Sequence, residues 1–394
     1  MKREALSLLL ASDTYHPDTN GAAYFSYRLA TLLVKRGHEV SVICPSRGFR
    51  QRTVCQAGVR VFGVRSLPLL IYPNFRFSPP FLAKPSIRKF LRLHRPDVVH
   101  IQNYFLLSNA VFEVAQELDI PIVGTNHMVP ENVSHHLHFS PRMETKVARY
   151  LWYRFVQIYK HLDAVTAPTP TAATLSQRPG LGKEVIPLSC GVDLRYFCPG
   201  EPDGKLKEEY RIPGRRILLY AGRLDKEKRI EVIISALPAI VERVDAHLVV
   251  AGTGKLRRAL ESLVADLGIR ERVTFTGYIP DDELRRFYRS AHLFVMAGTS
   301  ELQSIVTMEA MASGLPVIAA HALALPELVH DGENGFLFPP DDSRSLAAAA
   351  IRILSDEALR TAMAAKSLEI IQRHDIDTVV AAFESLYSKV LGSR

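Results

Sequence analysis

The fold is decided by two apolar runs and the segment between them: His292-Leu-Phe-Val-Met296, then Glu301-Leu-Gln-Ser-Ile-Val-Thr-Met-Glu309-Ala-Met-Ala-Ser-Gly314, then Leu315-Pro-Val-Ile-Ala319. The outer runs have the length and composition of buried strands, and the middle segment has the length of a helix. A strand, a helix and a second strand in this order build a parallel sheet that is covered by helices. We therefore expect an α/β protein with doubly wound sheets.

The same alternation fills both halves of the chain. In the first half, Leu6–Ala11 and Glu39–Cys44 are expected to be strands on either side of a helix over Ala22–Arg36. The second half restarts with a strand at Arg216–Tyr220. Because 394 residues exceed one ordinary core, we expect two domains. Proline and glycine cluster near residues 197–204, so the domains are predicted to span residues 1–196 and 197–375.

Composition excludes several classes of protein. The chain is 47% hydrophobic and 23% charged, as soluble globular proteins are. The apolar run Ala5–Ala11 is too short to span a bilayer, and with Met1-Lys-Arg before it makes a poor signal peptide, so a cytoplasmic protein is expected. The four cysteines show no zinc-ligand spacing, which predicts reduced thiols and no metal site. His135, His136 and His138 also match no zinc pattern.

Positive charge is concentrated in the first half. Residues 1–195 hold 24 Lys and Arg against 13 Asp and Glu, whereas the remainder holds 25 against 28. Residues 40–96 contain no acidic residue at all, but many basic and large apolar ones. A face that is both cationic and apolar suits an anionic membrane surface, and a solvated basic loop is the simpler alternative. No signature of a nucleic-acid-binding fold is present, so no nucleic acid partner is expected.

Two carboxylates stand at the ends of the opening segment. If the helix begins near Gln303, Glu301 and Glu309 lie roughly 12 Å apart at 1.5 Å of rise per residue. That distance is too long for two carboxylates attacking one bond, which lie about 5 Å apart in retaining glycosidases. It suits two contacts to one extended, hydroxylated ligand whose phosphates lie over the free N–H groups of the helix N-terminus.

Basic groups follow the first strand of the second half. The segment Ala221-Gly222-Arg223-Leu-Asp-Lys-Glu-Lys228 offers Arg223 and Lys228 to a diphosphate, whereas Lys226 is expected to be solvated. In the first half, Asn20-Gly21 opens a helix at the matching place, where backbone can approach a phosphate closely.

Two further motifs end strands. His127 closes the apolar run Pro121–His127 and is expected to lie in a cleft between the domains, although a lone histidine is more often structural. The turn Gly277-Tyr278-Ile279-Pro280 could contact a base through backbone groups and apolar side chains.

Together and in this order, these segments resemble the family 4 glycosyltransferases of the GT-B fold over essentially the whole chain. The stretch Asn126–Asn132 is most similar to that of the bacterial diacylglycerol glucosyltransferases and related lipid-directed members. The resemblance implies two Rossmann-like domains that face a central cleft, with a C-terminal helix over residues 376–394 packing back on the first domain. It also implies an enzyme that transfers a hexose with retention and without a metal or other cofactor.

The resemblance also implies roles for individual residues. Glu301 would bind donor-sugar hydroxyls, Glu309 the ribose, and His127 the sugar near the reacting centre. Arg223 and Lys228 would hold the diphosphate and act in catalysis with His127 and Glu301. The implied donor-binding set is Asn20, Gly21, Gly222, Arg223, Lys228, Tyr278, Ile279, Glu301, Leu302, Gln303, Ser304, Ile305 and Glu309.

The acceptor is expected to bind the basic first domain, at the inner face of the cell membrane. The candidate acceptor and membrane residues are Tyr15, His16, Arg76, Lys84, Arg88, Lys89 and Trp152. Burial inside the domain is the alternative for the aromatic residues near Trp152. The expected reaction moves glucose from UDP-glucose to a lipid hydroxyl such as that of diacylglycerol. The alternative is a GDP-mannose-dependent mannosyltransferase that acts on a phosphoinositide or a soluble sugar.

Overall fold

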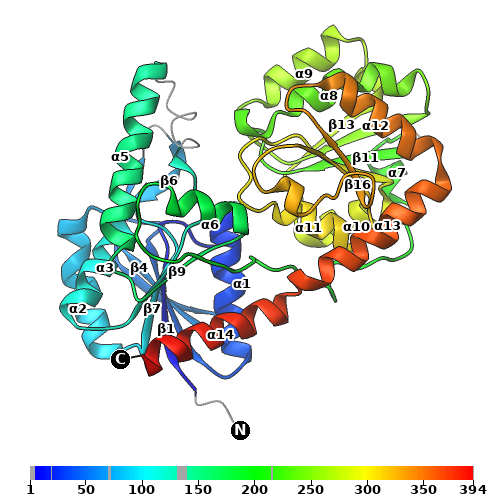
Figure 1. Cartoon of the computed structure of the whole chain (residues 1–394). Helices are drawn as coiled ribbons and strands as arrows, with labels where there is room; N and C mark the ends of the chain where they lie inside the picture. The colour runs from blue at the N-terminus through cyan, green and yellow to red at the C-terminus, as the bar shows by residue number, and fades with distance from the viewer. Residues whose placement is uncertain (1–4, 19, 70–71, 131–139, 214–215, 394) are drawn as a thin grey trace. The chain divides into compact units, whose positions relative to one another are not determined.

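The computed structural model describes residues 5–18, 20–69, 72–130, 140–213 and 216–393 of the chain. It divides into two compact units, the first made of Met1–Ser189 with Val379–Arg394 and the second of Cys190–Thr378. The division therefore falls several residues before the boundary expected from the proline and glycine cluster. In each unit a sheet is covered by helices on both faces (Figure 1).

The first unit contains an eight-stranded sheet in the order β10-β9-β8-β7-β1-β2-β4-β3, in which only the pairing of β3 with β4 is antiparallel. Its strands are β1 (Ser7–Ala11), β2 (Glu39–Pro45), β3 (Arg52–Gln56), β4 (Val59–Val64), β7 (Val98–Ile101), β8 (Ile122–Thr125), β9 (Ala164–Ala167) and β10 (Ile186–Pro187). A separate antiparallel pair is formed by β5 (Leu67–Leu69) and β6 (Tyr72–Phe77). The central strands β1, β7 and β8 are almost wholly buried, as expected for a sheet covered on both faces.

The helices of the first unit connect these strands. They are α1 (Gly21–Lys35), α2 (Pro80–His94), α3 (Leu106–Glu117), α5 (Pro141–Tyr159) and α6 (Pro170–Gln177), and most of α14 (Ile376–Gly392) also belongs to this unit. The amino-terminal part of α5 extends beyond the sheet in Figure 1.

The second unit contains six parallel strands in the order β13-β12-β11-β14-β15-β16. They are β11 (Arg216–Ala221), β12 (Ala246–Ala251), β13 (Val273–Gly277), β14 (Leu293–Met296), β15 (Val317–Ala320) and β16 (Gly335–Phe338). Numbered within the unit, this is the order 3-2-1-4-5-6 of the Rossmann fold. The strand order reverses between β11 and β14, and in such sheets ligands bind at the carboxyl ends of the two strands that flank the reversal.

Helices and 3₁₀ turns complete the second unit. The helices are α7 (Leu206–Glu209), α8 (Ile230–Val241), α9 (Arg257–Asp266), α10 (Asp281–Ser290), α11 (Ile305–Ala312), α12 (Ser343–Ser355) and α13 (Glu357–Ile371). The 3₁₀ turns are η1 (Lys226–Lys228), η2 (Arg270–Arg272), η3 (Leu325–Glu327) and η4 (Gln372–His374). Helix α11 begins at Ile305, so Gln303 lies in the turn before it rather than in its first turn as expected.

The C-terminal helix α14 packs on the first unit, as the family resemblance implied. Phe383 lies 5.7 Å from the ring of Phe25 and 5.5 Å from that of His100. One residue further along the helix, the buried Glu384 accepts hydrogen bonds from Arg36 at 3.2 Å and from His38 at 3.1 Å. Apolar rings and a buried carboxylate therefore hold this helix on α1 and the sheet.

The basic block over residues 40–96 is not one solvated loop. It contains β2, β3 and β4, the β5 and β6 pair, and helix α2. The sequence did not predict β3 to β6. Strands β3 and β5 are short and mostly exposed, so they lack the apolar run that marks a buried strand, whereas β4 is largely buried.

Candidate functional site

The strand order of the second unit places Arg223 and Glu301 at the same edge of the sheet. Arg223 follows β11, and Glu301 follows β14, the two strands between which the order reverses. Gly222 leaves the sheet with a φ of +146°, a conformation that favours glycine. The loops that follow β11 and β12 approach each other closely at Gly222 and Gly252. A Cβ atom at Gly252 would lie 1.8 Å from the Gly222 carbonyl oxygen, so position 252 requires glycine.

Arg223 is held by two carboxylates of its own turn. It donates to Glu227 Oε1 at 2.7 Å and also forms an ion pair with Asp225. Both carboxylates are buried, whereas Arg223 is partly exposed. Charged hydrogen bonds to buried partners fix the orientation of a guanidinium fork. The acidic side chains therefore position Arg223, a contribution that the sequence reading did not assign to them.

Lys228 and Glu301 are in direct contact. The distance from Lys228 Nζ to Glu301 Oε1 is 2.5 Å, and both side chains are largely buried. A Cβ atom at Gly298 would lie 2.8 Å from Glu301 Oε1, so glycine at this position leaves room for the carboxylate. The sequence reading assigned Lys228 and Glu301 to different parts of one ligand. The structure brings them together and adds Gly298 to the site.

Glu309 lies inside helix α11 and is buried. Its Oε2 accepts a hydrogen bond from the hydroxyl of Tyr288, on α10, at 3.2 Å. The same hydroxyl lies 3.1 Å from the carbonyl oxygen of Val306. Tyr288 thus positions the carboxylate, and sequence spacing gave no sign of it because α10 and α11 meet only in the folded chain.

The start of α11 presents backbone N–H groups. Ser304 precedes the helix, and its side chain does not cap it, because its Oγ accepts from Thr307 Oγ1 at 2.8 Å instead. The first N–H groups of an α-helix have no partner within the helix, and here they carry its positive dipole end. The Gln303 side chain accepts from the backbone N–H of Cys190 at 2.6 Å, so it supports the turn.

Three other residues of the implied donor set differ in exposure. Leu302 is buried, Ile279 is partly exposed, and Tyr278 is 65% exposed after the end of β13. Tyr278 and Ile279 therefore present side-chain surface, whereas Leu302 does not.

In the first unit, Asn20 and Gly21 begin helix α1. The Asn20 side chain accepts from the backbone N–H of Ala23 at 3.0 Å, which is an N-cap. Gly21 is the first helical residue and is exposed. Asp13, in the same loop, instead accepts from the backbone N–H groups of Leu107 and Ser108 at 2.9 and 3.0 Å and so caps α3.

His127 lies beyond the end of β8. Its Nε2 is 2.9 Å from Gln102 Oε1, and its ring lies 4.8 Å from that of Phe25. Burial lowers the pKa of His127 to about 4, so the ring is neutral at pH 7. A neutral imidazole can donate one hydrogen bond and accept another, but it cannot supply a positive charge to a phosphate.

The predicted acceptor and membrane residues fall into three groups. Tyr15 is buried, and His16 stacks on Tyr27 at 4.5 Å. Trp152 on α5 is partly exposed and packs edge-on to the buried Phe155 at 5.5 Å.

The cations of the third group are mostly paired. Arg76 donates to Ser66 Oγ at 2.8 Å, Lys84 pairs with Glu113, and Arg88 pairs with Glu117 at 2.6 Å. Lys89 is exposed, with no ion pair to any of the residues that the structure describes. Helix α3 thus supplies the acidic partners that the sequence of the basic block lacks.

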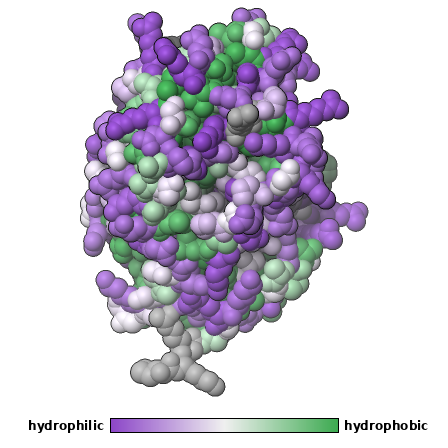
Figure 2. Space-filling model, turned by 90° about the vertical axis from the view of Figure 1, so that its right-hand side faces the viewer, coloured by the Kyte–Doolittle hydropathy of each residue, from purple (hydrophilic) through white to green (hydrophobic). Residues whose placement is uncertain are grey.

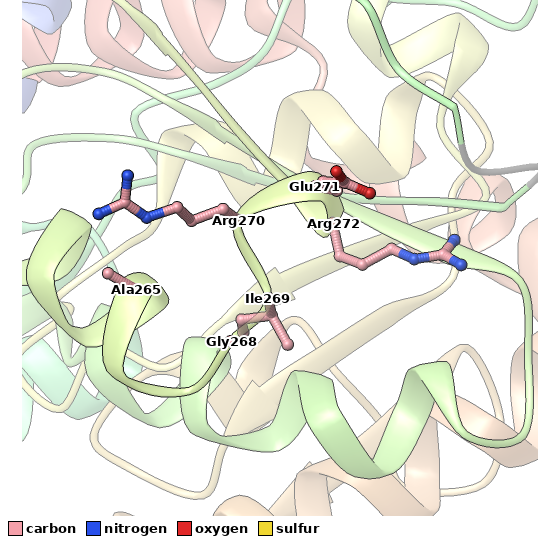
Figure 3. Close-up of a pocket in the computed structure, with 6 residues that line it drawn as sticks. All are labelled: Ala265, Gly268, Ile269, Arg270, Glu271 and Arg272. Atoms are coloured by element: carbon pink, nitrogen blue, oxygen red, sulfur yellow. The ribbon is translucent and has the colours of Figure 1, made fainter.

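A surface hollow in the second unit lies elsewhere. It is lined by Ala265, Gly268, Ile269, Arg270, Glu271 and Arg272. Figure 3 shows the side chains of Arg270 and Arg272 pointing away from each other. These residues precede β13, so they lie at the amino edge of the sheet, opposite to the edge that carries Arg223 and Glu301. The hollow is therefore separate from the candidate site.

Within the described ranges, no group of three or more His, Cys, Asp or Glu side chains has the arrangement of a metal site. His135, His136 and His138 lie outside the described residues. None of the described helices is long and apolar enough to cross a membrane.

Comparison with known protein families finds a separate match for each of the two units. The family described as Glycosyltransferase Family 4 matches residues 19–196, and Glycosyl transferases group 1 matches residues 203–369. The chain is a family 4 glycosyltransferase of the GT-B fold. It is therefore an enzyme, a hexosyltransferase, with two Rossmann-like units.

Curated relatives of this glycosyltransferase carry different names. A GDP-mannose-dependent alpha-mannosyltransferase of Corynebacterium glutamicum is 26% identical over 366 residues, which are 92% of this chain and 84% of that protein. An alpha-monoglucosyldiacylglycerol synthase of Streptococcus pneumoniae is 28% identical over 337 residues, which are 84% of this chain and 74% of that protein. The first name gives a sugar nucleotide as the donor, and the two names differ in the sugar.

A solved structure shares the fold. HepE of Anabaena in complex with UDP-glucose has a TM-score of 0.78 at 21% identity, and the match covers 97% of this chain and 100% of that one.

Proposed function

We propose that this glycosyltransferase moves glucose from UDP-glucose to a lipid hydroxyl, such as that of diacylglycerol, with retention and without a metal. The proposal assigns donor binding to the second unit and acceptor binding to the first. The observation that supports it is the cluster of Arg223, Lys228, Glu301 and the start of α11 at the point where the strand order reverses.

The cluster provides a way to stabilise a leaving diphosphate. Arg223, Lys228 and the N–H groups of α11 would face the negative charge that builds on it, as fixed donors aimed at developing charge. The Lys228 ion pair with Glu301 suggests an exchange: the donor takes Lys228, and the freed Glu301 binds sugar hydroxyls. A phosphate oxygen could then accept the proton of the acceptor hydroxyl on the same face, so the mechanism needs no second catalytic carboxylate.

We also propose that Glu309 binds the ribose of the donor. Glu309→Ala is expected to raise the donor KM by about tenfold, because a hydrogen bond to a charged group contributes about 1.5–3 kcal/mol. Tyr288→Phe is the matched control, since it keeps the carboxylate and removes only the hydroxyl that positions it. Initial rates at varied donor concentration measure both variants. Unchanged donor kinetics in Glu309→Ala would refute the ribose role.

An exposed surface of the first unit supports a lipid acceptor. Along α2, Phe81 is 76% and Leu93 72% exposed, and between them Lys89 and Arg92 are exposed cations. We call this surface the α2 face: Phe81, Leu82, Pro85, Lys89, Arg92 and Leu93. The exposed part of α5 adds Tyr150 and Tyr153 beside Arg142, Lys146 and Arg149. Apolar and aromatic side chains among cations that have no ion pair with any described residue fit the surface of an anionic bilayer.

Figure 2 shows the side of the molecule on the right in Figure 1, where hydrophilic side chains predominate and apolar side chains gather in a few patches between them. We propose that the protein is held at the inner face of the cell membrane through the α2 face and α5.

Neutralising the α2 face should weaken binding to lipid. Lys89→Gln with Arg92→Gln is expected to reduce sedimentation with anionic liposomes at low salt by about tenfold or more, at about 1 kcal/mol for each basic residue. Arg270→Gln with Arg344→Gln is the control, because it removes equal charge from exposed positions of the second unit. Equal loss in both double variants, or no loss in the first, would count against the α2 face as the membrane contact.

The alternative is a GDP-mannose-dependent mannosyltransferase that acts on a phosphoinositide or a soluble sugar, in line with the name of the Corynebacterium relative. A screen of radiolabelled UDP- and GDP-sugars against lipid extracts and soluble sugars separates the two. Labelled lipid formed from UDP-glucose is the expected product. Transfer from GDP-mannose alone would establish the alternative.

A further inference from the structure

Gln102 follows β7, the strand that holds the same place in the first sheet as β14, the strand before Glu301, holds in the second. The order of the first sheet reverses between β1 and β7, and Gln102 is the residue directly after β7. Its backbone N–H still bonds to the carbonyl oxygen of Ala11 at 2.9 Å, so the residue is fixed at the end of the sheet. Ligands of doubly wound sheets bind at such reversals. None of the sequence motifs included Gln102.

The side chain of Gln102 is fully buried and contacts the ring of His127. Its Oε1 lies 2.9 Å from His127 Nε2, and its Nε2 has no hydrogen-bond partner among the residues that the structure describes. With the amide oriented so that its oxygen faces the ring, Gln102 accepts from His127 Nε2, which puts the imidazole proton on Nε2 and leaves Nδ1 with its lone pair. The His127 ring also packs against Phe25, with the ring centroids 4.8 Å apart, which limits its rotation.

The neighbouring titratable group cannot replace Gln102 in this role. His100 lies two residues earlier, on β7, and both of its ring nitrogens are engaged, with Tyr387 OH at 2.8 Å and Thr125 Oγ1 at 2.7 Å. Burial lowers the pKa of His100 to about 3, so this ring is also neutral. Among the described residues, Gln102 is thus the side chain whose hydrogen bond selects the tautomer of His127.

We infer that Gln102 is a positioning residue that holds His127 as the neutral imidazole with its proton on Nε2, so that the Nδ1 lone pair is the one presented to a sugar hydroxyl. The second part rests on the proposed role of His127 at the donor sugar. The first part is a property of the free protein and can be measured without any substrate.

The first arm of the test is NMR spectroscopy of the free protein with ¹⁵N-labelled histidine. Long-range ¹H–¹⁵N correlation spectra distinguish a protonated ring nitrogen from an unprotonated one, and comparison with His127→Asn assigns the ring. The wild type is expected to show the proton on Nε2, and Gln102→Leu a mixture of both tautomers. Gln102→Glu should keep the proton on Nε2 and raise the pH at which the ring titrates, because a carboxylate favours imidazolium. A wild-type ring protonated on Nδ1 would overturn the inference.

The second arm is kinetic. Gln102→Leu is expected to lower kcat about 10- to 100-fold, the usual effect of removing a group that orients a functional histidine, with donor KM within about twofold. Thr125→Val is the control for structural damage, because it removes a buried hydrogen bond to His100 and leaves Gln102 in place. A fall in kcat of equal size in both variants would reduce Gln102 to a structural residue. If no sugar nucleotide supports transfer, the proposed function fails, and the NMR arm still decides the tautomer.

Discussion

Replacing Lys228 by alanine is expected to lower kcat by about 100- to 1,000-fold, the loss seen when one fixed donor is removed from a developing negative charge. Lys228 differs from Arg223 in that its ion-pair partner, Glu301, is itself proposed to bind the donor. The variant therefore removes charge from the leaving group and also leaves Glu301 without its 2.5 Å contact. Initial rates at saturating donor measure the effect.

Two matched variants separate these effects. Lys226→Ala removes an exposed lysine from the same 3₁₀ turn and should leave kcat unchanged within about twofold. Lys228→Arg keeps a cation and should retain more activity than the alanine variant. If Lys228→Ala and Lys226→Ala behave alike, Lys228 has no part in stabilising the leaving group.

The second large effect concerns the anchoring of α14. Glu384→Ala is expected to lower the free energy of unfolding by about 2–3 kcal/mol, because it leaves the buried His38 N–H without an acceptor and removes a charged hydrogen bond to Arg36. Arg36 is partly exposed, so water can hydrate its guanidinium in the variant. The loss of stability is therefore smaller than it would be for a fully buried ion pair. Urea unfolding followed by fluorescence measures the change.

The control for this variant is Glu369→Ala, on α13, where an exposed carboxylate pairs with Lys366 at 2.8 Å. Exposed pairs contribute about 0–1 kcal/mol, so its unfolding midpoint should barely move. Cleavage of the chain within α14 by a protease at low concentration should accelerate in Glu384→Ala. An unfolding midpoint that matches the wild type would show that α14 does not depend on this carboxylate.

Much of the candidate site could be predicted from the sequence because its residues follow strands that the sequence marks clearly. Arg223 and Glu301 each lie in the loop that follows an apolar run, and parallel strands end at one edge of a sheet. The family resemblance then supplied expected roles. Asp225, Glu227 and Tyr288 were not predicted, because each acts by positioning another side chain and carries no motif of its own.

The surface charge of the first unit could not be predicted in the same way. The block over residues 40–96 has no acidic residue, yet Lys84 and Arg88 pair with Glu113 and Glu117 of α3. The exposed cations that remain on α2 are fewer than the composition suggested. Lys89 and Arg92 are therefore better positions than Lys84 and Arg88 for substitutions that test membrane binding.

The amino-acid pattern specified the α/β alternation, the division into two domains and the strands that precede Arg223, Lys228, Glu301 and His127. These features depend on local periodicity, which short stretches of chain specify alone. The folded chain is what brings Lys228 to Glu301, Gln102 to His127, and acidic residues of α3 to cations of α2. Such pairings depend on distances in space between residues far apart in the chain, and the energies of charged and hydrogen-bonded groups change steeply with those distances.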